Sequence, residues 1–260
     1  MAGILFIISA PSGSGKSTLV SELRKQVSGV DFSISWTTRP PRGSEQDGRE
    51  YHFTDRDTFE RMIAAGEFME YAEVFGNYYG TSRGSLDAAR KEGQDLLLDI
   101  DVQGALQVRR SMPEAVSIFI MPPNPKVLRT RLRNRFRAEG QINEADLYRR
   151  LSEASKEIEN YREYGYILVN DILDRAVAQL EAIVLAERYY RNSEPIALRA
   201  RRVLEVAAAC RLPNSTERLK PVLEAFGILN PNGQQQLNFD EIPNPSDPIL
   251  GGLDEDDEDD

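Results

Sequence analysis

Short apolar runs alternate along the chain with longer segments in which apolar residues recur at helical spacing. The runs stand at residues 3–9, 96–100, 117–121 and 166–169. The helical spacing recurs at residues 17–27, 82–91, 126–137, 144–161 and 174–190. Uninterrupted apolar runs of this length predict buried strands. Because strands that alternate with helices favour a parallel sheet with right-handed crossovers, the pattern predicts an α/β fold.

Two parts of the chain break this alternation. Residues 33–81 are rich in Tyr, Phe, Thr, Gly and Arg, which suggests a small mixed insertion with a site of its own. Further on, residues 193–210 and 215–226 predict two helices, each beginning at a serine cap, although Pro221 weakens the second. Prolines and polar residues dominate from residue 230 onward and cannot form a core, so we expect a disordered tail at residues 230–260.

The composition is that of a soluble globular enzyme. Of the 260 residues, 40% are hydrophobic and 28% are charged. The apolar stretch at residues 4–8 is far shorter than a bilayer span and lacks the basic flank of a secretory signal. One cysteine excludes an intramolecular disulfide framework and a cysteine-ligated zinc site. We therefore expect a cytoplasmic protein with no membrane partner.

The net charge of −10 belongs to the end of the chain. Residues 240–260 hold ten acids and no Lys or Arg, which leaves 32 basic and 32 acidic side chains in the first 239 residues. A body that is neutral overall does not suggest general affinity for nucleic acid.

Residues 10–18, APSGSGKST, fit the phosphate-loop pattern G-x-x-x-x-G-K-[ST] with alanine in the first glycine position. A predicted strand before the loop and a helix after it supply the context in which backbone N–H groups surround a polyphosphate. Lys16 can reach the β and γ oxygens, and Ser17 can offer a hydroxyl to Mg²⁺. The predicted ATP-binding residues of the loop are Ala10, Pro11, Ser12, Gly13, Ser14, Gly15, Lys16 and Ser17. The alternative is a strand-to-helix turn without a ligand.

Asp99 and Asp101 stand two residues apart at the end of a predicted strand, so both are expected to face the same side. Ligands gather at the carboxyl ends of strands in open α/β sheets. The pair is therefore a candidate for ligand binding, and the alternative is a solvated strand end.

Basic side chains dominate residues 126–137, where six Lys and Arg residues occur without an acid. On a helix, Arg131 and Arg135 share a face. The segment is either a solvated basic helix or a lid that closes over ATP and brings arginines to the transferring phosphoryl group.

Five motifs, in order and in spacing, resemble the guanylate kinase family. They are SWTTRPPR at 35–42, EYHF at 50–53, FME at 68–70, GNYYGT at 76–81 and LDIDVQG at 98–104. The resemblance covers residues 3–188 and follows the bacterial form of the family. It implies the P-loop nucleoside monophosphate kinase fold, in which a parallel-sheet core carries a small mixed GMP-binding insertion (34–86) and a helical lid (124–151). Residues 193–229 would then be a helical C-terminal extension before the acidic tail.

The resemblance implies Mg²⁺-dependent transfer of the γ-phosphoryl group of ATP to GMP or dGMP, giving ADP and GDP in purine nucleotide metabolism. It places Glu70 against guanine, because a carboxylate accepts from both N1–H and the exocyclic amine, a donor pair that adenine lacks. Ser35 and Thr81 match contacts to the base edge, and Asp101 matches a residue facing the guanine nucleotide. Two guanidinium groups and two phenols suit the phosphate dianion of GMP. They belong to Arg39, Arg42, Tyr51 and Tyr79.

The same resemblance assigns the remaining site residues. Asp99 matches the residue on the Mg²⁺ side, together with Ser17, and Asn170 lies near the adenine. The catalytic residues that it implies are Lys16, Arg131, Arg135 and Arg150. The chain departs from the family at residues 134–136, where Asn-Arg-Phe replaces Gly-Arg-Gly, and at Ile172, which replaces a second Asp. Outside the site, His52 is predicted to be structural, and five aromatic residues are predicted to lie in the core. These are Phe53, Phe59, Phe68, Tyr71 and Phe75.

Two other interpretations remain at this point. Guanylate-kinase-like domains of scaffold proteins bind peptides and have lost the phosphate loop, whereas Lys16, Ser17 and Asp99 are present here. Related kinases that act on a ribose phosphate lack the base-reading insertion that Glu70 and residues 76–81 represent.

Overall fold

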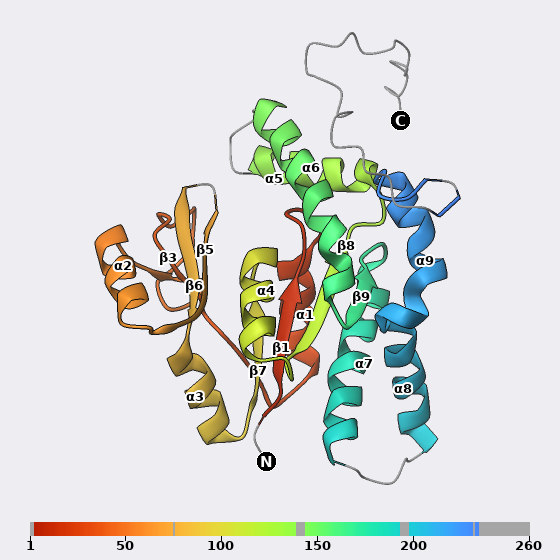
Figure 1. Ribbon diagram of the computed structural model, residues 1–260, viewed down its shortest axis with the longest axis horizontal. Helices are drawn as coiled ribbons and strands as arrows, with labels where there is room; N and C mark the ends of the chain where they lie inside the picture. Colours follow the sequence, from red (N-terminus) through yellow and green to blue (C-terminus); the bar gives the residue numbers. More distant parts are fainter. Residues whose placement is uncertain (1–2, 75, 139–143, 193–197, 231, 234–260) are drawn as a thin grey trace.

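A parallel sheet forms the centre of the computed structural model, with five strands in the order β2-β7-β1-β8-β9 (Figure 1). The structure describes residues 3–74, 76–138, 144–192, 198–230 and 232–233. The strands are β1 (Leu5–Ser9), β2 (Val30–Phe32), β7 (Asp95–Asp99), β8 (Val116–Met121) and β9 (Tyr166–Val169). Every neighbouring pair in this sheet runs parallel, which confirms the predicted fold class.

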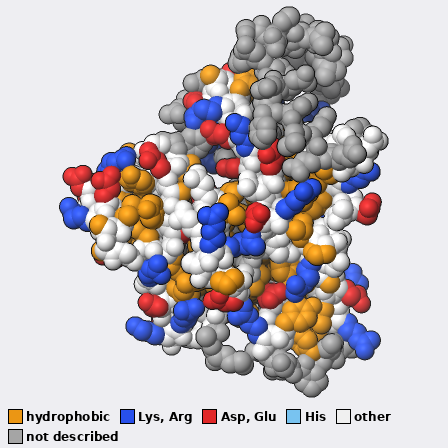
Figure 2. Space-filling model, viewed as in Figure 1, with side chains coloured by type: hydrophobic (Ala, Val, Ile, Leu, Met, Phe, Trp, Pro, Cys, Tyr) orange, Lys and Arg blue, Asp and Glu red, His pale blue; other side chains and the backbone are white. Residues whose placement is uncertain are grey.

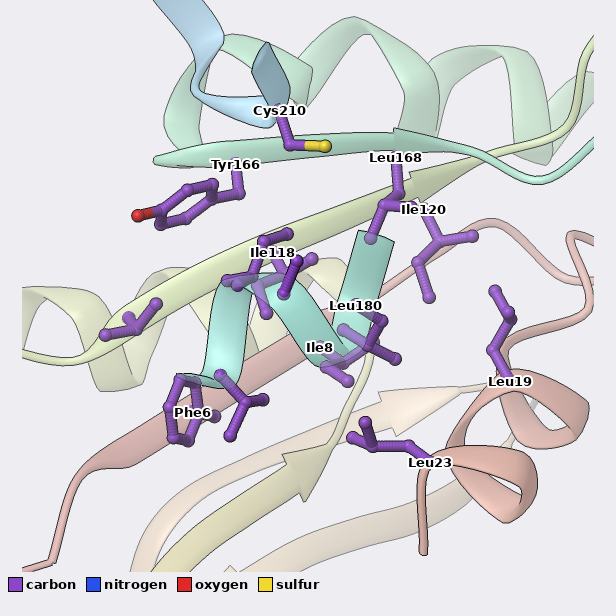
Figure 3. Packing of buried hydrophobic residues seen from close by; sticks show 14 of the residues in the cluster. Phe6, Ile8, Leu19, Leu23, Ile118, Ile120, Tyr166, Leu168, Leu180 and Cys210 are labelled. Carbon is purple, nitrogen blue, oxygen red and sulfur yellow. The ribbon is translucent and has the colours of Figure 1, made fainter. Parts of the chain in front are cut away.

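Helices cover both faces of this sheet. They are α1 (Lys16–Gln26), α3 (Arg83–Glu92), α4 (Val102–Ser111), α7 (Leu173–Asn192), α8 (Leu198–Cys210) and α9 (Leu212–Ala225). Successive side chains of a strand point to opposite faces. Phe6 and Ile8 therefore pack with α1, α7 and α8 on one face (Figure 3), whereas Leu5 and Ile7 pack with α3, α4 and α9 on the other.

The insertion carries a second, mixed sheet in the order β4-β3-β6-β5. Its elements are β3 (Trp36–Thr37), β4 (His52–Phe53), α2 (Arg56–Ala64), β5 (Phe68–Val74) and β6 (Asn77–Ser82). Phe59 and Phe68 are buried and stack with ring centroids 4.4 Å apart, as predicted for core residues. Tyr71 is wrong as a core prediction because its side chain is 41% exposed. Phe53 is half-buried, and Phe75 lies outside the described residues.

Two helices, α5 (Pro125–Ala138) and α6 (Glu144–Glu159), form the segment predicted as a lid. They have an apolar cluster of their own that joins Leu128, Leu132, Phe136, Leu147 and Ala154. A single 3-10 turn, η1 (Asn160–Glu163), follows α6 and leads into β9. The helix predicted at residues 144–161 therefore ends slightly earlier than expected.

The sequence pattern missed two elements and misplaced one residue. Neither β2 nor α4 was predicted. In β2, Asp31 is exposed between the half-buried Val30 and Phe32, and α4 begins shortly after the end of a strand. Asp101 does not lie on a strand, because β7 ends at Asp99 and Asp101 caps α4 by accepting from the Gly104 N–H at 2.8 Å. The two aspartates are therefore held by different elements.

The C-terminal extension is helical, with one corrected boundary. The second helix begins at Leu212, so Ser215 is not a cap: its buried hydroxyl donates to the carbonyls of Ala209 and Arg211. Pro221 lies inside this helix without ending it. Ser193, the cap predicted for the first helix, lies outside the described residues, as does the acidic tail beyond Gly233.

Two properties of the molecule as a whole follow from these elements. Within the described ranges, every helix is too short or too polar to cross a membrane. Figure 2 shows basic and acidic side chains interspersed over one face of the molecule, in keeping with the balanced charge of the first 239 residues.

Candidate active site

The phosphate loop joins the end of β1 to the start of α1, as the sequence predicted. Gly15 precedes the helix in a left-handed conformation (φ 88°), and Gly13 adopts φ 87°. Such values favour glycine, because a Cβ would clash with the backbone. A Cβ on Gly13 would also lie 2.9 Å from Cδ2 of Leu132 and 3.0 Å from Cδ1 of Leu128. The loop is therefore shaped by its own glycines and by helix α5 packed against it.

Lys16 is held by the end of strand β7. Its Nζ lies 2.5 Å from Oδ1 of Asp99 and donates to the Ile100 carbonyl at 2.9 Å, which also accepts from the Ser9 hydroxyl. Burial alone would lower the pKa of Lys16, but the Asp99 carboxylate outweighs that effect and holds the pKa above its usual value. A permanently charged ammonium group thus stands at the loop that would hold a polyphosphate.

The Ser14 carbonyl is the point at which three distant segments meet. It accepts from Nδ2 of Asn170 at 2.8 Å and from the guanidinium of Arg131 at 3.1 Å. Arg131 also donates to the Asn170 carbonyl at 2.9 Å. Among the described residues, the Oδ1 atom of Asn170 is buried without a hydrogen-bond partner. Arg131 therefore ties α5 to the phosphate loop and to the residue that follows β9, and Asn170 retains an acceptor for a donor outside the chain.

Glu70 is a buried carboxylate at the centre of the insertion. It lies on β5, is 4% exposed, and accepts from the Thr81 hydroxyl of β6 at 2.6 Å. Burial is the main reason that its pKa rises to about 7, and the Asp101 charge adds to this, while the Thr81 hydrogen bond opposes it. Thr81 and Asp101, both predicted for this site, therefore surround Glu70 as expected.

Gly104 makes room for that carboxylate. A Cβ on Gly104 would lie 2.3 Å from Oε2 of Glu70 and 3.2 Å from Oδ1 of Asp101, closer than atoms tolerate in the first case. Because Gly104 is on α4 and Glu70 is on β5, the glycine lets the core helix approach the insertion directly. This glycine belongs to the motif at residues 98–104, but the sequence alone predicts no role for it.

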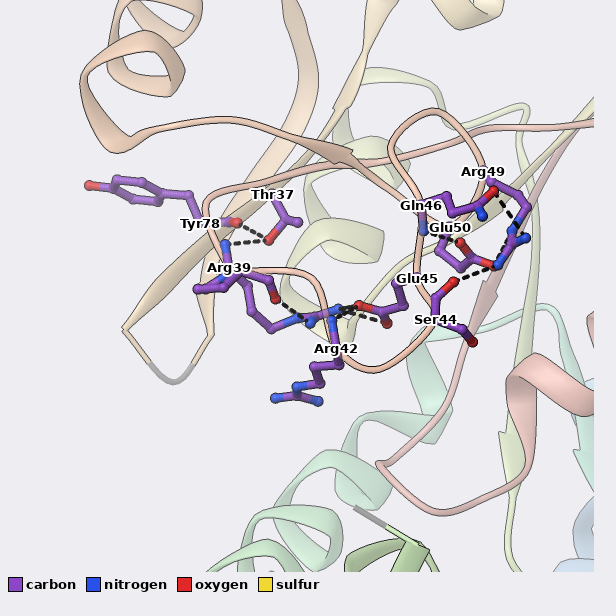
Figure 4. Close-up of polar contacts among 10 residues, drawn as sticks. Thr37, Arg39, Arg42, Ser44, Glu45, Gln46, Arg49, Glu50 and Tyr78 are labelled. Carbon is purple, nitrogen blue, oxygen red and sulfur yellow. Dashed lines mark hydrogen bonds and ion pairs between the residues drawn. The ribbon is translucent and has the colours of Figure 1, made fainter. Parts of the chain in front are cut away.

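Arg39 and Arg42 share one loop, which Glu45 organises (Figure 4). The guanidinium of Arg39, only 7% exposed, pairs with the Glu45 carboxylate at 2.9 Å and donates to the Pro40 carbonyl at 2.8 Å. The Glu45 carboxylate also accepts from the backbone N–H of Arg42 at 2.8 Å. In Figure 4 the Arg42 side chain points away from this pair. Glu45 was not among the predicted site residues, because its role depends on a turn that residue patterns do not reveal.

Tyr51 packs against Arg39 and is influenced electrostatically by Lys16 of the phosphate-loop helix. Its ring centroid lies 5.9 Å from that of Tyr79 and 5.3 Å from Cζ of Arg39. Burial raises the pKa of the Tyr51 phenol, and the nearby Asp99 carboxylate raises it further, whereas Lys16 lowers it. Three of the four predicted phosphate-binding side chains, Arg39, Tyr51 and Tyr79, are thus grouped, and Tyr51 is the one under the electrostatic influence of Lys16 and Asp99. Ser35 is half-buried just before β3, where its carbonyl accepts from the His52 N–H at 2.9 Å.

A sequence model described as guanylate kinase matches residues 3–187. The chain belongs to the guanylate kinase family. It is 54% identical over 226 residues to a guanylate kinase of Koribacter versatilis, covering 87% of this chain and 97% of the relative. It is 49% identical over 197 residues to one of Alkalilimnicola ehrlichii, covering 75% of this chain and 95% of the relative.

A solved structure supports the same family assignment. The guanylate kinase of Anaplasma phagocytophilum is 35% identical, with a TM-score of 0.59 and coverage of 72% of this chain and 86% of that one. A match of 226 residues in a chain of 260 necessarily reaches residue 226. The similarity to the Koribacter guanylate kinase therefore runs beyond the family model and through α8 and α9.

The structure describes a different setting for each predicted lid arginine of this family member. Arg131 contacts the phosphate loop, whereas the guanidinium of Arg150 lies over the Phe136 ring, 5.0 Å from its centroid. Arg135 is exposed near the end of α5. Arg131 is thus the lid arginine for which a contact with the phosphate loop is described.

Glu157 is a further charged group of the site that the sequence analysis missed. It lies on α6, and burial and the Asp101 charge raise its pKa to about 7, while Lys16 and the Ser12 backbone N–H oppose that rise. Its carboxyl is therefore within the electrostatic influence of Lys16 and Asp101 and accepts from the Ser12 N–H of the phosphate loop. On an amphipathic helix with several exposed acids, sequence spacing alone offers no signal that distinguishes Glu157 from its neighbours.

Proposed function

We propose that this protein transfers the γ-phosphoryl group of ATP to GMP or dGMP in the presence of Mg²⁺, giving ADP and GDP or dGDP. The observation that carries the proposal is the buried Glu70 carboxylate with its Thr81 partner. The same insertion holds Arg39 against the Tyr51 ring, and the Tyr51 phenol is within the electrostatic influence of Lys16. A buried acceptor without an internal cation is costly unless a ligand supplies donors. The N1–H and amine of guanine are such donors.

The two substrates would meet at Lys16. The phosphate of GMP would bind to Arg39, Arg42, Tyr51 and Tyr79, because guanidinium forks and phenols suit a dianion. The polyphosphate of ATP would bind to the phosphate loop, where the N-terminus of α1 offers backbone N–H groups. The vacant Oδ1 acceptor of Asn170 fits the exocyclic amine of adenine. Lys16 would then stabilise the charge that moves with the transferring group.

Ser17 and Asp99 would hold Mg²⁺. Ser17 is exposed at the start of α1 and the Asp99 side chain is 33% exposed, so both oxygen ligands are accessible. Magnesium is usually coordinated by one or two protein oxygen ligands together with substrate phosphates, and a hydroxyl with a carboxylate would supply such ligands. When bound, the ion would neutralise charge on the phosphate oxygens. We place the enzyme in the cytoplasm on the composition of the sequence, and the balanced charge of its body supports the prediction that nucleic acid is not a general partner.

The test is ADP release, measured with each nucleoside monophosphate in turn. We expect turnover with GMP and dGMP, and little with AMP, UMP, CMP or a ribose phosphate. Comparable turnover with AMP would contradict the role of Glu70. No ADP release with any acceptor would favour a binding module over an enzyme.

A further inference from the structure

We propose that the C-terminal extension is a brace for the ATP side of the active site, with Phe226 as its positioning residue. The brace consists of α8, α9 and the turn that follows, residues 198–229. It goes beyond the proposed function, although it takes from that function the assignment of ATP to the phosphate loop.

The extension is fixed to the edge of the central sheet. Strand β9 ends the sheet, and the junction of α8 and α9 pairs with it: Arg211 and Tyr166 form an antiparallel bridge, and the Leu212 N–H donates to the Gly165 carbonyl at 2.9 Å. One turn further into α9, the Arg218 guanidinium donates to the Ile167 carbonyl at 2.9 Å. Exposed strand edges carry unpaired backbone groups. Here α9 satisfies them, which fixes the start of the helix to β9.

The far end of α9 is fixed by its own cap. The Gly227 N–H donates to the Glu224 carbonyl and the Ile228 N–H donates to the Leu223 carbonyl, with Gly227 at φ 70°. This is the Schellman arrangement that ends many helices at a glycine. Ile228 is 5% exposed in the core cluster with Leu223. The cap therefore sets the direction of Phe226, the residue between the helix and the glycine.

Phe226 joins two hydrophobic clusters that are otherwise separate. It packs against the core cluster that contains Val222 and Leu223, and also against the lid cluster of α5 and α6. In Figure 1 the end of α9 lies beside the lid helices, whereas the start of α9 lies beside the first residue of β9. One side chain of the extension thus reaches the lid.

The lid cluster transmits this contact to the phosphate loop. Leu128 and Leu132 belong to the cluster and lie against Gly13, at the distances already given. Between them on α5, Arg131 holds the Ser14 carbonyl. A shift of α5 would therefore move both the leucines that pack against the phosphate loop and the arginine that donates to its Ser14 carbonyl. The GMP pocket is built on β5, β6 and α4. None of these elements belongs to the lid cluster, and β5 and α4 share with Phe226 only the core cluster that also contains Val222.

The experiment compares Phe226→Ala with Val222→Ala, a buried residue one turn earlier on α9 that packs only in the core cluster. We expect Phe226→Ala to raise KM for ATP about fivefold or more and KM for GMP less than about twofold. Val222→Ala should lower Tm and leave KM for ATP close to that of the parent. The dissociation constant of ATP, measured by calorimetry without GMP, should rise with KM in Phe226→Ala.

Three results would overturn the brace. They are an unchanged KM for ATP in Phe226→Ala, an equal rise in KM for both nucleotides, and a rise in KM for ATP in Val222→Ala as large as that in Phe226→Ala. Should Phe226→Ala fail to fold, Phe226→Leu decides in its place: a rise in KM for ATP of about twofold supports the brace, and parity with the parent contradicts it. The ATP dissociation constants test the brace even if the protein does not phosphorylate GMP. A failure to phosphorylate GMP would contradict only the proposed function.

Discussion

At the scale of single residues, burial decides what each charged group of the site can do. Lys16 remains charged because Asp99 lies 2.5 Å away. Glu70 accepts from the Thr81 hydroxyl but has no ion pair among the described residues, and its pKa rises to about 7. The first group suits a permanent role in neutralising phosphate charge. The second suits a ligand that brings its own donors, and it makes binding of that ligand depend on pH.

Lys16→Ala should abolish turnover and leave the fold intact. Loss of the ammonium removes stabilisation of charge in the transition state, so the effect should appear in kcat. Lys25→Ala is the matched control, since Lys25 is exposed on the same helix and pairs only with Glu22 in the contacts described. An unimpaired kcat, with a circular dichroism spectrum like that of the parent, would contradict the assignment of residues 10–18 as the ATP-binding loop.

Glu70→Gln should weaken GMP binding about ten- to a hundredfold, because charge-assisted hydrogen bonds contribute about 1.5–3 kcal/mol. The amide retains one acceptor oxygen but loses the charge, so base selectivity should also relax. The measurement is KM for GMP beside KM for ATP. A KM for GMP within about twofold of the parent would count against the contact.

The pH dependence of GMP binding follows from the same residue. Guanine donors bind the ionised carboxylate, and Glu70 of the free protein must lose a proton near pH 7 to offer it. KM for GMP should therefore rise as pH falls from 8 to 6, by up to about tenfold for each pH unit below that pKa. Glu70→Gln should abolish most of this rise and retain only the smaller part due to the phosphate of GMP. Parallel profiles for parent and variant would refute the assignment.

Gly104→Ala should raise KM for GMP and leave KM for ATP nearly unchanged. Its new methyl group would lie 2.3 Å from Oε2 of Glu70, so the carboxylate must move. Gly84→Ala on α3 is the control, since its Cβ would meet only the Ser82 hydroxyl at 3.7 Å. If both alanines behave alike, the close approach of α4 to Glu70 does not matter for binding.

At the scale of elements, the sequence predicted the helices and strands that have a clear local pattern of apolar residues. It missed those whose formation depends on tertiary contacts. The phosphate loop, four core strands and both lid helices follow from apolar spacing and turn residues. Strand β2 does not, because a strand of three residues with an exposed aspartate at its centre carries too little apolar pattern and gains its structure by pairing with β7. Glu45 and Glu157 were missed for a similar reason. Glu45 meets Arg39 through a turn that residue patterns do not reveal, and Glu157 interacts with groups of other elements.

Arg131 illustrates the same division. Its position on a basic helix indicated a lid, but only the structure places its guanidinium on the Ser14 and Asn170 carbonyls. Helix α5 is thereby tied to the phosphate loop by a group with two separate donors, a geometry that lysine cannot reproduce.

Arg131→Lys should therefore raise KM for ATP several-fold and lower Tm, because one ammonium group cannot bridge both carbonyls. Arg133→Lys is the control on the same helix, since Arg133 is exposed and pairs with Glu144 at 2.8 Å. Thermal unfolding and KM for both substrates decide the outcome. Equal effects of the two substitutions would show that ATP binding depends on basic charge on α5 rather than on the hydrogen bonds of Arg131 to the Ser14 and Asn170 carbonyls.

At the scale of the whole molecule, charge is divided between a neutral body and an acidic end. Ten acids in residues 240–260 stand against a basic helix α5 in the same chain, and a tether raises the local concentration of one at the other. The tail could therefore compete with ATP for the lid arginines. Against that competition, exposed ion pairs contribute little and are screened within about 8 Å at physiological salt.

Truncation after Gly233 should therefore leave activity unchanged at physiological ionic strength. This truncation keeps Ile228 and the cap of α9, so it removes the acids without disturbing the core contacts of the extension. The measurement is kcat/KM for ATP at low and at physiological salt, in the parent and the truncated chain. A gain of more than about threefold at low salt alone would identify the tail as an autoinhibitor, because only a screened electrostatic contact disappears with added salt. A loss of activity at both salts would show instead that residues 234–260 support the fold.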